Sequence, residues 1–230
     1  VLREFLPPGI NYDNGWVEEF LTLLDREGIC YLDNTGIMIE KSREGEILFN
    51  RKYNAMHWND LGAYYGMNNL LGKLKKDFPA LHINRPEDFV ITEKLNTTLP
   101  VSEFPIHEYE PLYFLRTELL NNTDEFKDKL ILHPMYRDFD YRINTIRQKE
   151  GAPRVLVFQG SYVTGMGYKF LANSFGEYIA IHCYQNVFDL DYYFDLFQPD
   201  CVIFETAEFT LSDTYFSPQG MENFDLEAGK

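Results

Sequence analysis

The pattern of apolar and polar positions predicts a helix and then a strand near the start of the chain. Apolar residues recur at helical spacing over residues 16–25, where Asn14 can cap the helix and Gly28 follows its end. The residues on the apolar face are Phe20, Leu21 and Leu24. The run Ile29–Leu32 then predicts a short strand that ends at Asp33.

A second helical pattern begins after residue 58 and is longer than the first. Asn59 or Asp60 can cap this helix, and Pro79 stops it. Its apolar positions are Leu61, Tyr64, Leu71, Leu74 and Phe78. The polar and aromatic residues that precede it form a loop that opens directly into the helix.

Short apolar runs alternate with helical patterns in the last third of the chain. Arg154–Phe158 and Tyr178–His182 predict strands, and so does Cys201–Glu205. A helix over residues 165–175 and another ending at Phe197 separate them. This alternation is typical of a parallel sheet with crossover helices. We therefore predict a three-layer, flavodoxin-like α/β fold, with residues 1–230 as one domain.

Residues 80–150 follow neither pattern clearly. Five prolines interrupt the stretch, and only isolated runs such as Phe89–Thr92 resemble strands. The prolines are Pro86, Pro100, Pro105, Pro111 and Pro134. We expect this stretch to be irregular but strand-containing, and to be an insertion into the domain.

Composition and charge narrow the class of protein. Of 230 residues, 45% are hydrophobic and 16% aromatic, which indicates a globular chain and excludes a disordered one. The net charge of −15 argues against nucleic acid and anionic membranes as partners. The three cysteines are too scattered for a disulfide framework or a zinc site, so we expect no metal or other cofactor. The chain contains no apolar run of membrane-spanning length, and its first residues suggest a piece of a longer precursor.

Ser161 stands where a nucleophilic serine would be expected. It follows the predicted strand Arg154–Phe158 and precedes a helix, and ligands bind at the carboxyl ends of parallel strands. Such a turn exposes the hydroxyl group and directs backbone N–H groups at a developing oxyanion. A serine that merely caps the helix would show the same local pattern.

A serine nucleophile needs a base at neutral pH, and two histidines are candidates. His57 lies in the polar loop before the second helix, next to Trp58. His182 lies at the end of a predicted strand, where a structural histidine is equally compatible with the pattern.

Three sequence blocks resemble a known family. The run His57-Trp58-Asn59-Asp60-Leu61-Gly62-Ala63-Tyr64 is similar to the His-Trp-Asn-x-x-Gly-Ala-Tyr motif of the SGNH-hydrolase-like proteins of the alginate O-acetyltransferase family. The run Phe158-Gln159-Gly160-Ser161, followed by Phe170-Leu171-Ala172-Asn173-Ser174-Phe175, resembles the strand, Gly-Asp-Ser turn and helix of that family. A third block is Pro199-Asp200, an apolar strand, and then Glu205 and Glu208. The resemblance covers about residues 1–78 and 154–216.

The resemblance implies acyl ester chemistry, with Ser161 as the nucleophile and His57 as the general base. Two characteristic positions differ, because the family Asp two residues before the histidine is Ala55 and the Asp of Gly-Asp-Ser is Gly160. Loss of the acid of a Ser-His-Asp triad costs on the order of 10⁴ in rate.

Several explanations for the missing acid remain open. Another carboxylate can replace it, or a backbone carbonyl can orient His57 in a Ser-His dyad. The candidate carboxylates are Asp60, Asp33, Glu205 and Glu208. Alternatively, the chain carries an introduced Asp→Ala change, or it is a degenerate relative that binds glycan without turnover.

The resemblance also implies a carbohydrate substrate and an exported location. We expect O-acetyl transfer or O-deacetylation of an exported bacterial polysaccharide, in an extracytoplasmic compartment. An acyl donor, a carbohydrate acceptor and a membrane acyltransferase would be the partners. The candidate substrate-binding residues are Trp58, Tyr64, Tyr162 and Asn186, with Tyr184 as a further stacking candidate. Asn186 can donate to an oxyanion, although a role in its own turn fits its sequence position better.

Overall fold

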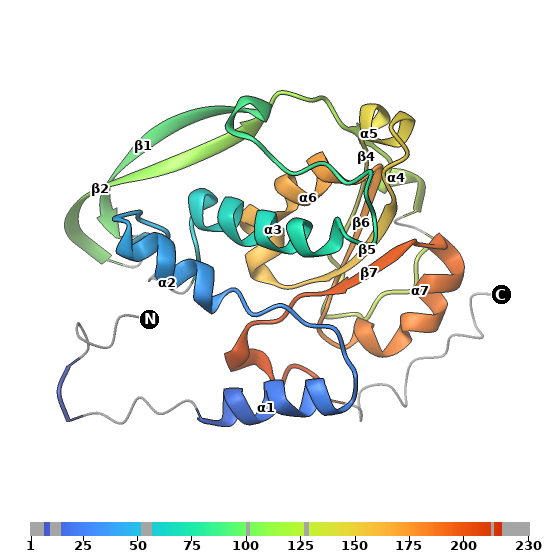
Figure 1. Ribbon diagram of the computed structural model, residues 1–230, viewed down its shortest axis with the longest axis horizontal. Coiled ribbons are helices and arrows are strands. Elements are labelled where there is room, and N and C mark those ends of the chain that lie inside the picture. The colour runs from blue at the N-terminus through green and yellow to red at the C-terminus, as the bar shows by residue number, and fades with distance from the viewer. Residues whose placement is uncertain are drawn as a thin grey trace. The chain divides into compact units, whose positions relative to one another are not determined.

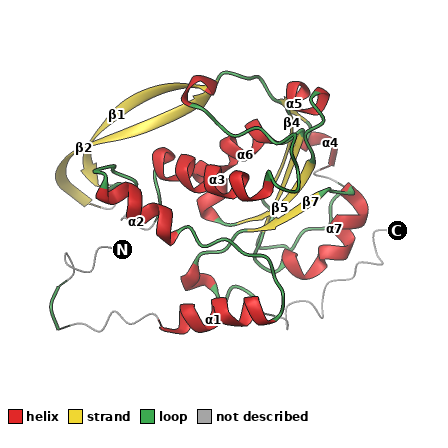
Figure 2. Ribbon diagram, viewed as in Figure 1, coloured by secondary structure: helices red, strands yellow, loops and turns green. Residues whose placement is uncertain are grey.

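The computed structural model describes residues 7–9, 15–51, 57–99, 102–126, 129–212 and 214–217. The chain divides into two compact units, Val1–Glu46 and Ile47–Lys230. Figures 1 and 2 show the helices and strands of both units. All of the elements that matter for the candidate site belong to the second unit.

The first unit contains two helices, α1 (Gly15–Arg26) and α2 (Thr35–Arg43). The helix predicted over residues 16–25 is confirmed, and Gly28 follows it with a φ of +69°, a conformation that favours glycine. Asn14, its expected cap, lies outside the described residues. The strand predicted over Ile29–Leu32 is wrong, because these residues form an irregular link between the helices. Asp33 accepts hydrogen bonds from the N–H and hydroxyl of Thr35 and so helps to start α2.

The second unit is built around a mixed sheet of five strands in the order β3-β4-β6-β5-β7. The strands are β3 (Leu120–Asn121), β4 (Phe139–Ile143), β5 (Arg154–Gln159), β6 (Glu177–His182) and β7 (Cys201–Phe204). β5 pairs in parallel with both β6 and β7, as predicted. β4 runs antiparallel to β6, and β3 runs antiparallel to β4. The expectation of a purely parallel sheet is therefore wrong, because two strands from the middle of the chain complete it.

Three helices cover the two faces of this sheet. They are α3 (Asp60–Leu74), α6 (Tyr168–Ser174), which follows a π-helical turn over Val163–Gly167, and α7 (Leu190–Phe197). α3 and α6 lie on one face and α7 lies on the other (Figure 1). The chain passes from β5 through α6 to β6, and then through α7 to β7 on the opposite side of β5. The carboxyl end of β5 is thus a topological switch point, where open α/β sheets bind ligands.

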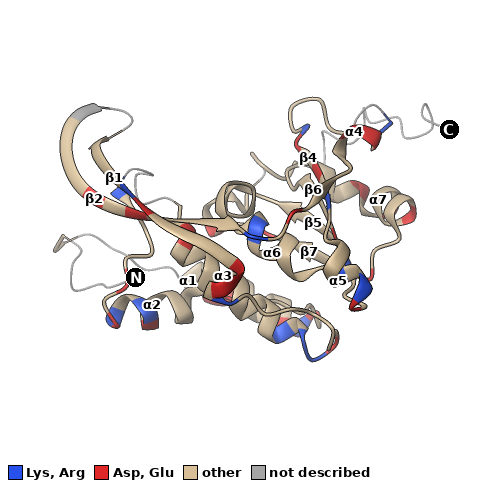
Figure 3. Cartoon of the chain, turned by 90° about the horizontal axis from the view of Figure 1, so that it is seen from above, with Lys and Arg blue, Asp and Glu red and all other residues tan. Residues whose placement is uncertain are grey.

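The stretch predicted to be irregular contains regular structure. It forms a long antiparallel hairpin, β1 (Phe89–Leu99) and β2 (Ser102–Leu115), which extends beyond the sheet (Figures 1 and 3). Pro105 and Pro111 lie within β2, where they had suggested a break. Both strands of a two-stranded ribbon are edge strands, so proline at outward-facing positions removes no ladder hydrogen bond. That residues 80–150 are an insertion stays a prediction.

The short elements of this region are α4 (Thr123–Phe126), α5 (Thr145–Lys149) and the 3₁₀ turn Pro86–Asp88. Two further 3₁₀ turns, Asn186–Asp189 and Glu208–Thr210, follow β6 and β7.

The core explains why β5 is apolar at successive positions. Leu156 and Phe158 pack in one cluster with β6 and with Tyr193 and Phe197 of α7. Val155 and Val157 alternate with them and are also completely buried, on the face that α3 and α6 cover. A strand that is buried on both faces reads as a continuous apolar run, and the one buried polar side chain of β5, Gln159 at its end, accepts a hydrogen bond from the Tyr178 hydroxyl.

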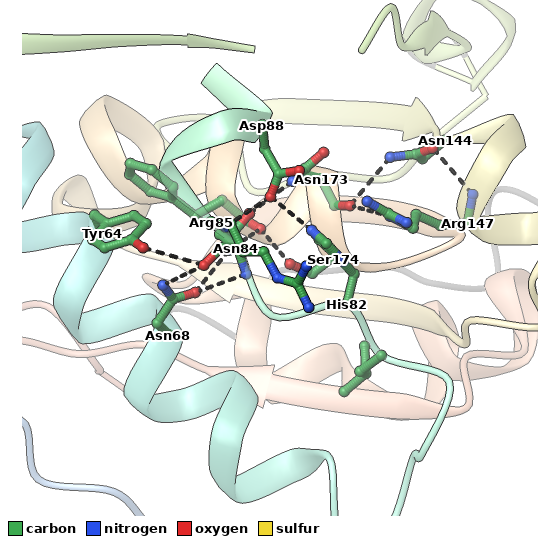
Figure 4. Close-up of polar contacts among 12 residues, drawn as sticks. Tyr64, Asn68, His82, Asn84, Arg85, Asp88, Asn144, Arg147, Asn173 and Ser174 are labelled. Atoms are coloured by element: carbon green, nitrogen blue, oxygen red, sulfur yellow. Dashed lines mark hydrogen bonds and ion pairs between the residues drawn. The ribbon is translucent and has the colours of Figure 1, made fainter. Parts of the chain in front are cut away.

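A polar network holds α3 against α6 through the loop between α3 and β1 (Figure 4). The buried Asn84 side chain donates to Asn68 of α3 and to the carbonyl of Phe170 in α6, and accepts from Asn173. Its carbonyl also accepts from the Tyr64 hydroxyl, 3.2 Å away. The loop is closed by the 2.7 Å contact between His82 Nε2 and Asp88 Oδ2. This network joins the two helices whose first residues flank the candidate site.

The beginning of β5 is joined to β6 by an ion pair. The Arg154 guanidinium donates two hydrogen bonds to the carboxylate of Glu177, at 2.9 and 2.8 Å. The Tyr141 hydroxyl of β4 and the Gln148 amide donate to the same carboxylate. Burial raises the pKa of Glu177, but the hydrogen bonds from Arg154 and Tyr141 outweigh it and lower the pKa below its usual value.

We expect Arg154→Met to lower the free energy of unfolding by about 2–3 kcal/mol, because it leaves the Glu177 carboxylate partly buried without its cation. Adding Glu177→Gln should recover part of that loss, because the unpaired charge is then gone. Arg51→Met, which removes a more exposed pair with Glu108, should change stability by less than about 0.5 kcal/mol. Urea unfolding of the four proteins measures these differences. Equal losses of unfolding free energy for Arg154→Met and Arg51→Met would show that the Arg154–Glu177 ion pair contributes no more to stability than an exposed pair does.

Candidate active site

The structure brings His57 and Ser161 together across 104 positions of sequence. His57 Nε2 lies 2.7 Å from Ser161 Oγ, within hydrogen-bond distance. Ser161 follows β5 and Gly160 and is the first helical residue of the segment that leads into α6. Its side chain is exposed and that of His57 is half-buried. This is the contact that a serine nucleophile needs with its base.

Trp58 and Asn59 explain why His57 lies at this point. The buried Trp58 indole donates from Nε1 to the carbonyl of Tyr162, 2.9 Å away, and so ties the residue after His57 to the residue after Ser161. Asn59 caps α3 by accepting from the Gly62 N–H, as predicted, and its amide donates to Asn50. A Cβ at Gly62 would lie 2.7 Å from the carbonyl oxygen of Leu48, so only glycine allows this close packing.

Tyr162 lies against both residues of the His-Trp pair. Its ring centroid is 5.0 Å from that of His57 and 5.3 Å from that of Trp58, which it meets edge-on. Burial raises the pKa of its phenol, and the charges of Glu205 and Glu208 raise it further. Of the four predicted substrate-binding residues, Tyr162 is the one that contacts His57.

Glu205 and Gly160 fit together below Ser161. The Gly160 N–H donates to the Glu205 carboxylate, which also accepts from the backbone of Val163. A Cβ on residue 160 would lie 2.7 Å from Glu205 Oε2, so the missing side chain leaves the space that the carboxylate fills. The Glu205 N–H in turn donates to the carbonyl of Phe158, 2.9 Å away, which continues the β5–β7 pairing to this point.

Burial also dominates the ionisation of Glu205. It raises the pKa of this carboxyl to about 7, although the two backbone hydrogen bonds favour the charged form. Glu205 is thus a carboxyl close to the serine whose charge changes near neutral pH.

Asp60, predicted as a substitute acid, has other partners. Its carboxylate lies 2.7 and 2.8 Å from Lys169 Nζ and accepts from the Tyr113 N–H at 2.8 Å. Sequence reasoning did not identify Lys169 as a partner, and no local pattern connects two residues 109 positions apart. Asp60 therefore joins α3, α6 and β2.

Structural contacts also account for the other three predicted substrate-binding residues. The Trp58 indole is buried beneath Tyr162, and the Tyr64 ring packs between Tyr113 and Phe170. The Asn186 side chain is completely buried and bonds to backbone groups of His133, Tyr136 and His182, which supports its role in the turn.

Among the described residues, Ser161 is the one whose side chain forms a hydrogen bond with His57, through Nε2. Ala55, the position of the family acid, lies outside them. Within the described ranges, no three His, Cys, Asp or Glu side chains are grouped so that they could hold a metal ion.

None of the helices in the described part of the chain is both long and apolar enough to span a membrane.

No protein-family model and no curated protein sequence matches the chain. Several solved structures are similar to it, and two of them resemble it in fold over most of the chain. A DHHW family protein from Eubacterium siraeum is 15% identical, with a TM-score of 0.63 over 95% of this chain and 78% of that one. The O-acetyltransferase domain of Pseudomonas putida AlgJ is 14% identical, with a TM-score of 0.57 over 98% of this chain and 78% of that one.

Bacillus cereus PatB1 with a sulfonyl adduct is 18% identical, with a TM-score of 0.49 over 68% of this chain. This chain spans 59% of that structure. At such identities the likeness concerns the fold alone, and the chain shares its α/β fold with the DHHW family protein and with the O-acetyltransferase domain of AlgJ.

Proposed function

We propose that this protein carries out acyl ester chemistry on a polysaccharide, either O-acetyl transfer or O-acetyl removal. The observation that supports this most is the 2.7 Å contact between His57 Nε2 and the exposed hydroxyl of Ser161 at the switch point of the sheet. The resemblance in fold to the O-acetyltransferase domain of AlgJ supports the same reaction class. In this proposal the protein acts outside the cytoplasm, with an acyl donor, a carbohydrate acceptor and a membrane acyltransferase as partners.

In the proposed reaction, Ser161 Oγ attacks the acyl carbonyl carbon and its proton passes to His57 Nε2. The tetrahedral intermediate expels the donor alcohol, which takes that proton from His57 and leaves an acyl-serine ester. A sugar hydroxyl or water then attacks the ester carbonyl and loses its proton to His57. The second tetrahedral intermediate breaks its bond to Ser161 Oγ, which takes the proton back from His57, and the acylated sugar or free acid is released. The Ser161 N–H, in the first helical turn, is directed toward the developing oxyanion.

Glu205 is proposed as a positioning residue for this turn and not as the acid of a triad. Its carboxylate accepts from the amides of Gly160 and Val163, on either side of Ser161 and Tyr162. The Gly160 N–H is therefore engaged by Glu205 and does not serve as an oxyanion donor.

A non-catalytic glycan-binding module is the second candidate. It is favoured by the fact that no carboxylate among the described residues hydrogen-bonds to His57. In that case the contact between His57 and Ser161 would be structural and would take part in no reaction.

We expect the wild-type protein to release 4-nitrophenol from 4-nitrophenyl acetate, and Ser161→Ala or His57→Ala to lower kcat/KM by at least about 10³. His107→Ala and Ser42→Ala serve as controls and should leave the rate unchanged, since His107 is exposed on the hairpin and Ser42 belongs to the first unit. If the wild type and Ser161→Ala both match the uncatalysed rate, the esterase proposal fails and the binding module is favoured.

The raised pKa of Glu205 predicts a pH-dependent difference in stability. The usual pKa of this carboxyl is 4.5, and in the folded protein it is about 7. Between these two pH values the folded protein binds more protons at Glu205 than the unfolded protein does. The wild type should therefore lose stability relative to Glu205→Gln as the pH rises through this window, by up to a few kcal/mol, with no further change above it. Urea unfolding of both proteins from about pH 4 to about pH 8 measures the difference. Parallel curves would contradict the raised pKa.

The fit between Gly160 and Glu205 predicts coupled substitutions. Gly160→Ala should displace the carboxylate from the amides and lower stability by about 1–3 kcal/mol, together with activity on 4-nitrophenyl acetate. In a Glu205→Ala background the same change should cost much less, because the Cβ then meets open space. A double-mutant cycle measures the coupling. Simple additivity would show that the two residues do not share this space.

A further inference from the structure

A hollow of about 290 Å³ lies next to the candidate site, between β2 and the beginnings of α3 and α6. Its volume is near the lower end for small-molecule pockets, about 300 Å³. The lining residues are Asp60, Leu112, Tyr113, Phe114, Leu115, Tyr168 and Lys169. We propose that this hollow is a subsite for one neutral sugar residue of the polysaccharide, an inference that rests on the proposed function.

The polar part of the hollow is the ion pair between Asp60 and Lys169. The pair is almost buried, with the Asp60 residue 5% exposed and the Lys169 side chain 13% exposed. An ammonium has three N–H donors, and Asp60 is the acceptor that the described residues provide for Lys169. One donor is thus left for a ligand, and Asp60 Oδ1, which among the described residues accepts from Lys169 alone, retains a lone pair for a sugar hydroxyl, whereas Oδ2 accepts from both Lys169 and the Tyr113 N–H. A cation and a carboxylate side by side suit groups that both donate and accept hydrogen bonds.

The apolar part of the hollow is aromatic. Phe114 is 54% exposed, so part of its side chain is open to a ligand at the rim of the hollow. Tyr168 adds a second ring with a hydroxyl group. A sugar ring has one face of C–H groups and an edge of hydroxyls, so it would place the face on Phe114 and the hydroxyls toward the ion pair.

The charge of the protein indicates that the sugar is neutral. Asp60 cancels the charge of Lys169, so the hollow offers no net cation to a carboxylate or sulfate group. The whole chain carries a net charge of −15, and basic segments are short and scattered along the described ribbon (Figure 3). A polyanionic chain would be repelled by this field.

The position of the hollow fits a residue next to the one that is acylated. Asp60 follows His57 by three residues, and Lys169 follows Ser161 by eight residues along one helical segment. Eight residues of helix correspond to about 12 Å. A ring in the hollow therefore lies too far away to react with Ser161 but can belong to the same glycan chain.

Binding is measured by calorimetry with the Ser161→Ala protein, so that turnover plays no part. The neutral probes are cellopentaose, mannopentaose and chitopentaose, and the acidic probe is a guluronate pentamer. We expect at least one neutral probe to bind, and the acidic probe to bind at least about tenfold more weakly. Failure of all three neutral probes to bind, or tighter binding of the acidic one, would overturn the inference.

Phe114→Ala tests the location and should weaken binding of the neutral probe about tenfold. The matched control is Phe104→Ala, which removes a ring that is 63% exposed on the same strand, outside the lining of the hollow. Equal effects of the two changes, or none from Phe114→Ala, would overturn the inference.

These outcomes are separate from those of the proposed function. If neutral probes bind through Phe114 but 4-nitrophenyl acetate is not hydrolysed, the subsite stands and the esterase proposal fails. If the ester is hydrolysed but Phe114→Ala leaves glycan binding unchanged, the subsite fails alone.

Discussion

The hydrogen bond from the Trp58 indole to the Tyr162 carbonyl is the interaction on which the candidate site depends. His57 lies just before α3, and Ser161 begins the helical segment that leads into α6. The distance between them therefore depends on how these two segments are held together. Trp58 is buried and makes this bond one residue after His57, so the two helix starts are joined next to the contact between His57 and Ser161. The ion pair between Asp60 and Lys169 joins the same two segments further along. Two buried contacts on one side of the pair leave little freedom for the His57–Ser161 distance.

The last third of the fold could be predicted from sequence because its signals are local. A strand buried on both faces reads as a short continuous apolar run, and Val155–Phe158 shows this directly. β4 was missed because its residues alternate over only five positions and it pairs with β6, far along the chain. The hairpin was missed because Pro105 and Pro111 suggest breaks, whereas a two-stranded ribbon tolerates proline on its outer edges. A strand was predicted at Ile29–Leu32 but is not present there. An apolar run forms a strand only where another strand pairs with it.

The contact between His57 and Ser161 could be anticipated from sequence, whereas the roles of the residues around it could not. Ser161 and His57 stand at a strand end and at a helix start, which sequence patterns reveal. Trp58 was expected to stack on a sugar, but it is buried and its indole N–H donates to the Tyr162 carbonyl. Sequence does not distinguish a ring that binds a ligand from one that packs in the core, because the difference lies in the tertiary contacts. Asp60 was expected to orient His57, but the Lys169 ammonium is a stronger partner for a buried carboxylate.

Gly160 stands where the Gly-Asp-Ser pattern has an aspartate, and the contact with Glu205 gives a structural reason for the glycine. A side chain at this position would occupy the space of the Glu205 carboxylate, so the glycine and the glutamate require each other. The N–H groups in the first turn of the helix that starts at Ser161 have no intrahelical partners, and the Glu205 carboxylate accepts from one of them, that of Val163, as well as from the preceding Gly160. In the family pattern, position 160 itself carries a carboxylate, whereas here Glu205 brings one to the same turn from the end of β7. Burial raises the pKa of this carboxyl to about 7, so its charge depends on pH near neutrality. The turn that carries Ser161 therefore has beside it a carboxylate that is held by two backbone amides and whose charge responds to pH.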